Sequence, residues 1–147
     1  MGVNIRVTIQ DKEIRDLLEK VKARTGNLKP AMELIGEVML KSVKRNFDEQ
    51  GRPVKWAPLA KSTIKSRKFP DKPILQQYGN LRKITYAAFN DRVVIGSMVE
   101  KYAAIHQLGG VAGRGHKAKI PARPFLMVQD EDWSSIKDVI MEYLMSK

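Results

Sequence analysis

The amino-acid sequence predicts an α+β fold, in which a small antiparallel sheet packs against one long helix and additional helices, with extended loops between them. Three observations support this prediction. Apolar and polar residues alternate at the N-terminus, apolar residues recur at helical spacing between residues 28 and 47, and two β-rich runs in the second half lie two residues apart. Because helices and strands are segregated along the chain, an α+β arrangement is favoured over a doubly wound one.

The chain is long enough for one domain with its own core. It has 147 residues, 43% of them hydrophobic and 29% charged, and no cysteine. We expect a single domain over residues 1–147 that needs no disulfide or metal, with flexible loops at about residues 51–73 and 109–119. No apolar run resembles a secretory signal or reaches the ~20 residues of a membrane helix. The sequence therefore indicates a soluble, intracellular protein that has no membrane contact.

The first third of the chain is expected to form one strand and two helices. Four apolar residues define one face of the strand: Val3, Ile5, Val7 and Ile9. Asp11 is suited to cap the first helix and Gly26 to end it. The second helix is expected from about Leu28 to Phe47. Its apolar stripe consists of Leu28, Met32, Ile35, Met39, Val43 and Phe47, with charged residues on the opposite side.

The segment between residues 48 and 73 reads as a loop rich in proline and basic residues, with one short helix at about Ala60 to Arg67. Trp56 is expected to anchor this loop by packing into the domain. The alternative is a stacking platform for single-stranded nucleic acid, which typically uses several aromatic side chains. Because only Trp56 and Phe69 accompany the basic residues, packing is the favoured interpretation.

The second half is expected to begin with a β-hairpin and a short helix. The runs Ile84–Phe89 and Arg92–Ser97 are joined by Asn90-Asp91, residue types that tolerate a tight hairpin turn. Ser97 and Glu100 have the S-x-x-E spacing of a capping box, so a helix should start there and extend through Leu108. Gly109 is suited to end it in a left-handed conformation.

The remaining residues are expected to form a glycine-rich loop, a rigid segment and a last helix. Pro121 and Pro124 each force the preceding residue toward an extended backbone. Residues 120–125 should therefore form a stiff, extended arm. The last helix should begin at Asp130 or Asp132, because carboxylates favour a helix N-terminus. Its apolar face consists of Trp133, Ile136, Ile140, Tyr143 and Leu144.

The net charge of +11 is concentrated in the middle of the chain. Residues 51–123 contain 15 Lys and Arg against 3 Asp and Glu, whereas residues 124–147 contain 2 against 5. Such a distribution fits contact with nucleic acid, complementary surfaces between copies of one chain, or a solvated basic face that maintains solubility. Charge alone leaves these three interpretations open.

No combination of residues predicts catalysis, a bound metal or a cofactor. His106 and His116 lack the H-E-x-x-H spacing that places two ligands on one helix face, and Ser62 and Thr63 have no nearby base. His106 is expected to be a packed or interface histidine whose ring nitrogens find hydrogen-bond partners. We therefore expect a protein that is not an enzyme.

An ordered series of short motifs extends from Phe47 to Leu144. Its first part consists of Phe47, Gly51, Trp56-x-Pro58-Leu59, Thr63, Lys65, Gly79-x-Leu81 and Val94-x-Gly96-Ser97. Its second part consists of Tyr102-Ala103-x-Ile105-His106-Gln107-x-Gly109 and Pro121-Ala122-Arg123-Pro124-Phe125-Leu126. In this combination the chain resembles the phage virion morphogenesis family, which includes tail-completion proteins of contractile-tailed phages such as Mu. Tyr78 is a departure, because the family usually has Ser or Thr there.

The resemblance implies a structural phage or prophage protein with the α+β fold of neck and tail-completion proteins. Such a protein completes the tail or joins it to the filled head, and it is expected to form a homo-oligomeric ring, a hexamer in this family. Its partners would be the tail tube, the tail terminator or the head connector. It would reside in the virion, at the tail or neck, and in the host bacterial cytoplasm during assembly.

Eight residues are expected to take part in assembly: Trp56, Tyr102, His106, Arg114, Lys117, Lys119, Arg123 and Phe125. The aromatic residues, His106 and Arg123 would position the central loop and the arm. The basic loop 114–119 would contact a neighbouring subunit or the tail tube. For Arg123, an ion pair within the monomer is an equal alternative. A basic nucleic-acid-binding module close to DNA is the alternative function, and a small hydrolase is a third.

Overall fold

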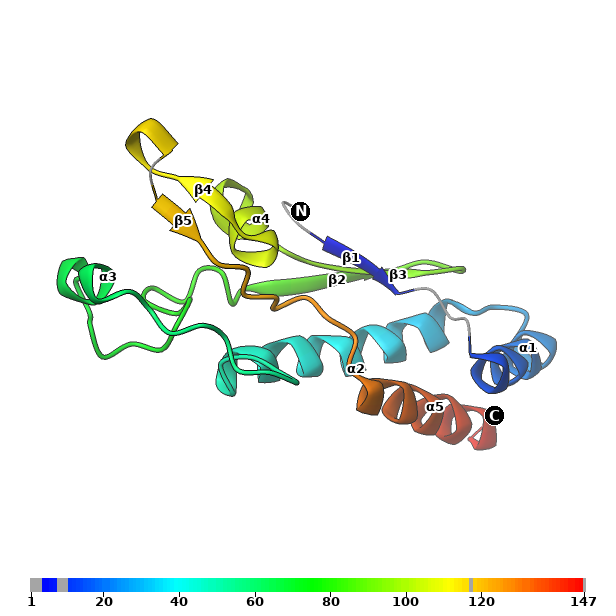
Figure 1. Ribbon diagram of the computed structural model, residues 1–147. Coiled ribbons are helices and arrows are strands. Elements are labelled where there is room, and N and C mark those ends of the chain that lie inside the picture. Colours follow the sequence, from blue (N-terminus) through cyan, green and yellow to red (C-terminus); the bar gives the residue numbers. More distant parts are fainter. Residues whose placement is uncertain (1–3, 8–10, 117, 147) are drawn as a thin grey trace.

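The computed structural model describes residues 4–7, 11–116 and 118–146 (Figure 1). The first half contains β1 (Asn4–Val7), α1 (Lys12–Thr25), α2 (Lys29–Asp48) and α3 (Lys61–Ser66). The second half contains β2 (Ile84–Ala88), β3 (Val93–Ser97), α4 (Glu100–Leu108), β4 (Gly110–Ala112), the 3₁₀ turn η1 (Arg114–His116), β5 (Ala118–Ile120) and α5 (Asp130–Met145). The α+β prediction is confirmed.

A three-stranded antiparallel sheet lies on one side of the long helix α2. Its strand order is β1-β3-β2, so β3 is the central strand. The hairpin predicted from Asn90-Asp91 is confirmed, with the Phe89 amide donating to the Arg92 carbonyl at 2.9 Å. In Figure 1, α2 runs between this sheet and α5, with α1 near the end where α5 finishes. The core therefore lies on both sides of α2.

The predicted apolar stripe of α2 is the centre of this core. Ile35, Met39, Val43 and Phe47 are each 0% exposed, and Met32 is 3% exposed. Ile136 and Ile140 of α5 are also fully buried and belong to the same cluster. The caps of α1 are likewise confirmed: Asp11 accepts from the Ile14 amide at 3.1 Å, and Gly26 is left-handed with φ 71°. The predicted strand residues Val3 and Ile9 lie outside the described residues.

Two local predictions differ from the structure, and a third is refined by it. Ser97 is the last residue of β3 and does not cap α4; its hydroxyl accepts from the Val99 amide at 3.2 Å, which makes a turn before the helix. The predicted start of the last helix at Asp130 or Asp132 is confirmed, since α5 begins at Asp130; its N-cap is Gln129, and Asp132 at the third helical position completes a capping box with it. Residues 109–119, expected to form a glycine-rich loop, contain the short antiparallel pair β4–β5.

Gly36 sets how closely α2 approaches the sheet. A Cβ atom at this position would lie 2.3 Å from Cδ2 and 2.9 Å from Cγ of Tyr86, which belongs to β2. The aromatic ring therefore lies directly on the helix backbone. One residue further along α2, Glu37 accepts a hydrogen bond from the Tyr86 hydroxyl at 2.7 Å.

The bond from Tyr86 to Glu37 predicts a pH effect. This bond, together with burial and the negative charges of Glu37 and Glu33, raises the pKa of Tyr86 to about 12 from its ordinary value of 10.0. Because the folded-state pKa is raised, the contribution to stability is complete below about pH 10 and is lost as pH rises toward 12. Glu37→Gln should lower the pKa of Tyr86 in a spectrophotometric titration. Glu33→Gln should lower it less, and equal effects of the two variants would contradict the assignment.

Candidate functional site

Residues 123–126, which include the second half of the predicted arm (residues 120–125), have backbone groups that are held by side chains and by one helix carbonyl. The Gln107 Oε1 atom accepts from the amides of Phe125 and Leu126, both at 3.0 Å, and its Nε2 atom donates to the Leu126 carbonyl at 2.8 Å. The Arg123 amide donates to the His106 carbonyl at 2.7 Å. Residues of α4 thus replace the strand partner that an extended segment otherwise needs. Residues 121–125 form no helix, and these bonds bring the motif of α4 and the motif of the arm together.

Two further side chains bind the arm from the opposite direction. Trp56 donates from Nε1 to the Pro124 carbonyl at 2.9 Å, and Asn46 of α2 donates from Nδ2 to the Phe125 carbonyl at 2.7 Å. The rings of Trp56 and Phe125 both contact Phe47, with centroids 5.7 Å and 5.4 Å away. Trp56 is 7% exposed and Phe125 is 0% exposed. Packing of Trp56 into the domain is therefore confirmed, and this cluster joins α2, the loop and the arm.

Arg123 binds backbone atoms of the loop. Its Nε atom donates to the Ala57 carbonyl at 2.9 Å, and its Nη2 atom donates to the Pro58 carbonyl at 3.1 Å. Arg123 is 5% exposed. Arg123 therefore binds within its own monomer, as the alternative predicted, but its partners are carbonyl oxygens. The predicted ion pair is wrong, since no carboxylate of the described residues pairs with this guanidinium.

Replacing Arg123 with Ala should destabilise the monomer. The change leaves the carbonyls of Ala57 and Pro58 without their charged donor, and we expect a loss of about 2 kcal/mol in the free energy of unfolding. Urea denaturation measures this loss. Light scattering on the same samples measures assembly, and a fully stable variant that no longer assembles would show instead that Arg123 acts between subunits.

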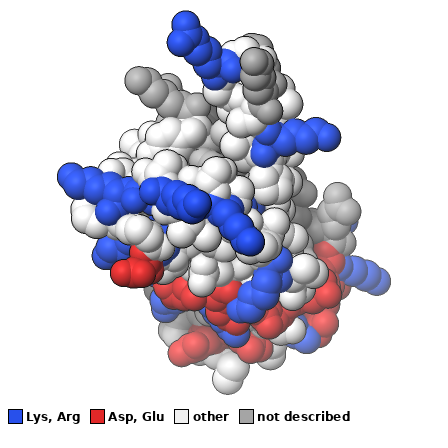
Figure 2. All heavy atoms as spheres, turned by 60° about the vertical axis from the view of Figure 1, so that its left-hand side comes forward, with Lys and Arg blue, Asp and Glu red and all other residues white. Residues whose placement is uncertain are grey.

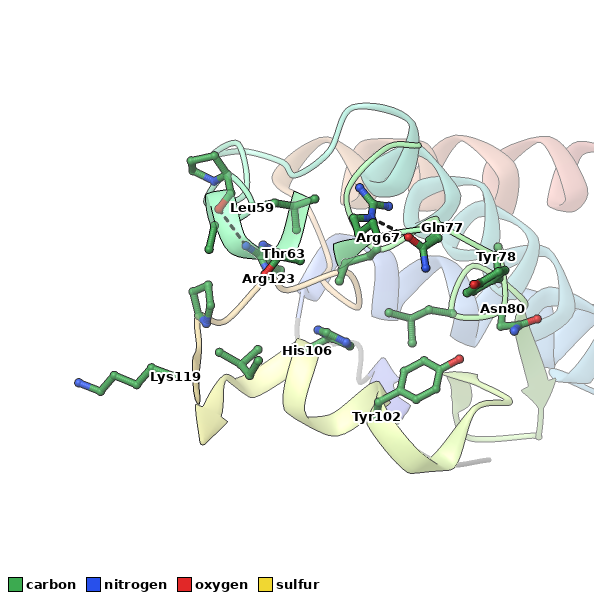
Figure 3. Close-up of a pocket in the computed structure, with 17 residues that line it drawn as sticks. Leu59, Thr63, Arg67, Gln77, Tyr78, Asn80, Tyr102, His106, Lys119 and Arg123 are labelled. Atoms are coloured by element: carbon green, nitrogen blue, oxygen red, sulfur yellow. Dashed lines mark hydrogen bonds between the residues drawn. The ribbon is translucent and has the colours of Figure 1, made fainter. Parts of the chain in front are cut away.

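A pocket of about 590 Å³ lies between α3, α4 and β5 (Figure 3). Pro58, Leu59 and Ile120 contribute apolar wall, while Tyr78 and Tyr102 are partly exposed at its edge. Three cations also line it: Arg67, Lys119 and Arg123. In Figure 3, His106 lies in the middle of these groups, and the Lys119 side chain extends outward. A volume of this size is typical of sites that accept a small molecule or a few side chains.

His106 is the polar group at the centre of this pocket. Its ring is half-buried and forms an edge contact with Tyr102, with centroids 6.0 Å apart. Burial lowers the pKa of His106, and the charge of Arg123 lowers it further. Nδ1 is buried and has no hydrogen-bond partner among the described residues. The expectation that both ring nitrogens find partners is therefore wrong for Nδ1.

Below the arm, a buried polar network surrounds Arg52. The guanidinium donates to Asn46 Oδ1 at 2.9 Å, to Ser42 Oγ at 2.7 Å and to Glu131 Oε1 at 2.5 Å. Ser42 in turn donates to Asp132 of α5 at 2.7 Å. Sequence reasoning counted Arg52 with the basic loop, but the side chain is only 8% exposed. Its charge therefore contributes to the interior and little to the basic surface.

Other basic residues are exposed at the end of the molecule that carries α3 and the β4–β5 hairpin. Arg114 in η1 and Lys119 in β5 are exposed on the hairpin, and Lys117 lies outside the described residues. Figure 2 views this end and shows Lys and Arg side chains over its upper and middle parts, with a band of Asp and Glu below. Among the described residues no cluster suited to a metal ion occurs. The helices of the described ranges include none long and apolar enough to cross a bilayer.

Comparison with known proteins gives one family and one curated relative. The model of the phage virion morphogenesis family matches residues 9–145. The chain belongs to this family. It is also 37% identical over 132 residues to Mu-like prophage FluMu G protein 2 of Haemophilus influenzae, which covers 90% of this chain and 89% of that protein. No solved structure matches the chain.

Membership in the phage virion morphogenesis family establishes a role in phage structure and assembly and an association with the virion. The resemblance noted from Phe47 to Leu144 is confirmed, and the match reaches further toward the N-terminus, across α1 and most of α2. The two most specific motifs of the family resemblance are the two segments that contact each other through Gln107 and Arg123.

Gln107 and Asn46 belong to the candidate site but are not among the residues that the sequence predicted for it. Both bind the arm, yet each lies within a helix, where a polar residue usually faces solvent. A signal was available for Gln107. An extended arm bounded by prolines has backbone groups that need partners, and Gln107 ends the conspicuous Tyr-Ala-x-Ile-His-Gln motif immediately before the chain turns back.

Proposed function

We propose that this protein completes the phage tail and helps to join it to the head, acting as a homo-oligomeric ring of six subunits. The observation that supports this best is the separation of charge along an elongated molecule. Basic side chains gather on the hairpin and α3 end, whereas α5 carries five acidic residues and one lysine. Opposite charges at different places on one chain favour a head-to-tail contact, and such contacts close into rings when the rotation permits.

In this proposal the rigid and the exposed parts of the site have different tasks. Trp56, Phe125 and Arg123 are buried and fix the shape of the loop and arm. Tyr102, His106 and the exposed hairpin residues Arg114 and Lys119 form the contact surface toward a neighbouring subunit, the tail tube, the tail terminator or the head connector, and Lys117, outside the described residues, is assigned to the same contact. No reaction is required of the protein, which works through its shape and its contacts.

Electron microscopy tests this proposal directly. The purified protein is examined alone and after mixing with phage tails prepared without it. We expect rings, and added density at one end of the tail. The double variant Arg114→Glu/Lys119→Glu should lose this binding, whereas Lys61→Glu/Lys65→Glu on α3 changes the charge equally without touching the hairpin. A protein that stays monomeric and leaves the tails unchanged would overturn the proposal.

A basic nucleic-acid-binding module is the second candidate, and the exposed lysines of α3 favour it. Binding to duplex DNA would then decrease steeply with salt, with a logarithmic slope of about −0.9 for each phosphate neutralised. Lys61→Glu/Lys65→Glu would weaken such binding. Weak binding without this slope would favour the assembly role.

A further inference from the structure

The pocket between α3, α4 and β5 carries positive charge that the described part of the chain does not neutralise. Arg67 donates to Gln77 Oε1 at 3.0 Å and to the Lys72 carbonyl at 2.9 Å, and Arg123 donates to the carbonyls of Ala57 and Pro58. Lys119 is exposed at the rim. None of these three forms a described ion pair. An apolar cavity with such a rim favours an occupant that is both apolar and acidic.

The exposed apolar residues of the chain include one pair with these two properties. Some of the large exposed apolar side chains lie beside a cation; for example, Val111 pairs with Lys119 across the hairpin, and Phe89 packs against Arg92. Met141 and Met145 differ, because the lysine one turn before them on α5, Lys137, is paired with Glu13 of α1. They are 40% and 83% exposed, lie one turn apart on α5, and are accompanied by Asp138 and Glu142.

The geometry of the molecule separates this pair from its own pocket. In Figure 1, α5 ends at one extremity of the structure, whereas α3, α4 and β5 lie toward the other. The end of α5 therefore cannot fill the pocket of its own chain without unfolding. A second copy can supply it, and flexible methionine side chains adapt well to an irregular cavity. The Leu144 carbonyl at the end of α5 already accepts from Arg24 of the same chain at 2.9 Å, so the attraction toward the pocket comes from the exposed carboxylates of Asp138 and Glu142.

We propose that the pocket receives the C-terminal turns of α5 from a second copy of this chain, with Met141 and Met145 in the cavity and with Asp138 and Glu142 toward its cationic rim. This inference rests on the proposed ring and names the two surfaces that close it. The neighbouring helix α1 carries five basic and three acidic residues, whereas Asp138 and Glu142 are exposed on α5.

The absence of cysteine allows a direct test by disulfide trapping. Tyr78, 61% exposed at the pocket, and Met145 are replaced together by Cys in the full chain. A disulfide requires Cα atoms closer than about 7 Å, so oxidation should give a ladder of covalent oligomers. The matched control replaces Tyr78 and Ser134, an exposed residue about 16 Å further up α5, and should give no ladder.

Charge reversal provides a second readout that does not depend on oxidation. Glu142→Lys should weaken self-association about tenfold or more in sedimentation velocity, because it places a cation against the rim cations. Lys119→Glu in the same chain should restore part of the loss. Ser134→Lys, which changes charge on the same helix outside the proposed contact, should have a much smaller effect.

The outcomes separate this inference from the proposed function. Both experiments are carried out with the protein alone and with phage tails present. Rings without trapping of the Tyr78→Cys/Met145→Cys pair would overturn the docking of α5 and leave the ring intact. A protein that neither self-associates nor binds tails would overturn both proposals. Trapping of the pair together with a silent Ser134 control would establish the contact.

Discussion

Replacing Phe125 with Ala is expected to lower the free energy of unfolding by about 3 to 5 kcal/mol. The side chain is 0% exposed and packs against Phe47, 5.4 Å between ring centroids, so truncation leaves a cavity where α2 meets the arm. Native domains have only about 5 to 15 kcal/mol of stability, so the variant should be close to unfolding. Urea denaturation followed by tryptophan fluorescence measures the change.

Phe69→Ala is the matched control for Phe125→Ala. Phe69 also contacts an aromatic ring, that of Tyr78, with centroids 5.8 Å apart, but it is 41% exposed. Removing this ring should therefore lower the free energy of unfolding by less than about 1 kcal/mol, because a partly exposed ring buries less apolar surface on folding than a fully buried one. Equal effects of the two variants would contradict the structural role assigned to the arm.

Arg52→Ala is expected to cost about 3 kcal/mol. The guanidinium is 8% exposed and holds Ser42, Asn46 and Glu131 together, so its removal leaves buried acceptors without donors. The network connects α2 to the start of α5 through Asp132. The midpoint of thermal unfolding should be lowered. The rates of amide hydrogen exchange should rise most in the first turn of α5.

Arg45→Ala is the control for Arg52→Ala, because both arginines contact Glu131 but only Arg52 is buried. Arg45 also reaches Glu131, at 3.4 Å, but its side chain is 57% exposed. Surface ion pairs contribute at most about 1 kcal/mol, so this variant should be close to the parent protein in stability. A loss as large as that of Arg52→Ala would mean that the charge on Glu131, and not the buried network, accounts for the effect.

The regular elements could be predicted because their signals are local. Asp11, Gly26 and the stripe through Met39 and Val43 specify their helices by capping geometry and periodicity, and the Asn90-Asp91 turn specifies its hairpin. The capping box predicted from Ser97 and Glu100 was wrong because the Ser97 hydroxyl can instead accept from an amide two residues away, that of Val99. The pairing of β4 with β5 was missed because three-residue strands carry almost no periodic signal.

The candidate site was predictable in its segments but not in its contacts. The sequence identified the arm and the helix before it, while the contacts of Gln107 and Asn46 depend on how distant elements meet. Charge counting misjudged the surface in one specific way. Arg52 and Arg123 were counted among the basic residues of the middle, yet both are buried and bond neighbouring groups of their own chain.

The hydrogen bonds from the arm to Gln107 couple the exchange of two amide hydrogens. A single carboxamide oxygen accepts from the amides of both Phe125 and Leu126. Neither amide hydrogen can exchange with deuterium until the Gln107 side chain moves away, and this movement exposes both hydrogens at once. The arm and α4 therefore separate in one step. A ligand that holds α4 in place would slow exchange at these two positions without contacting them.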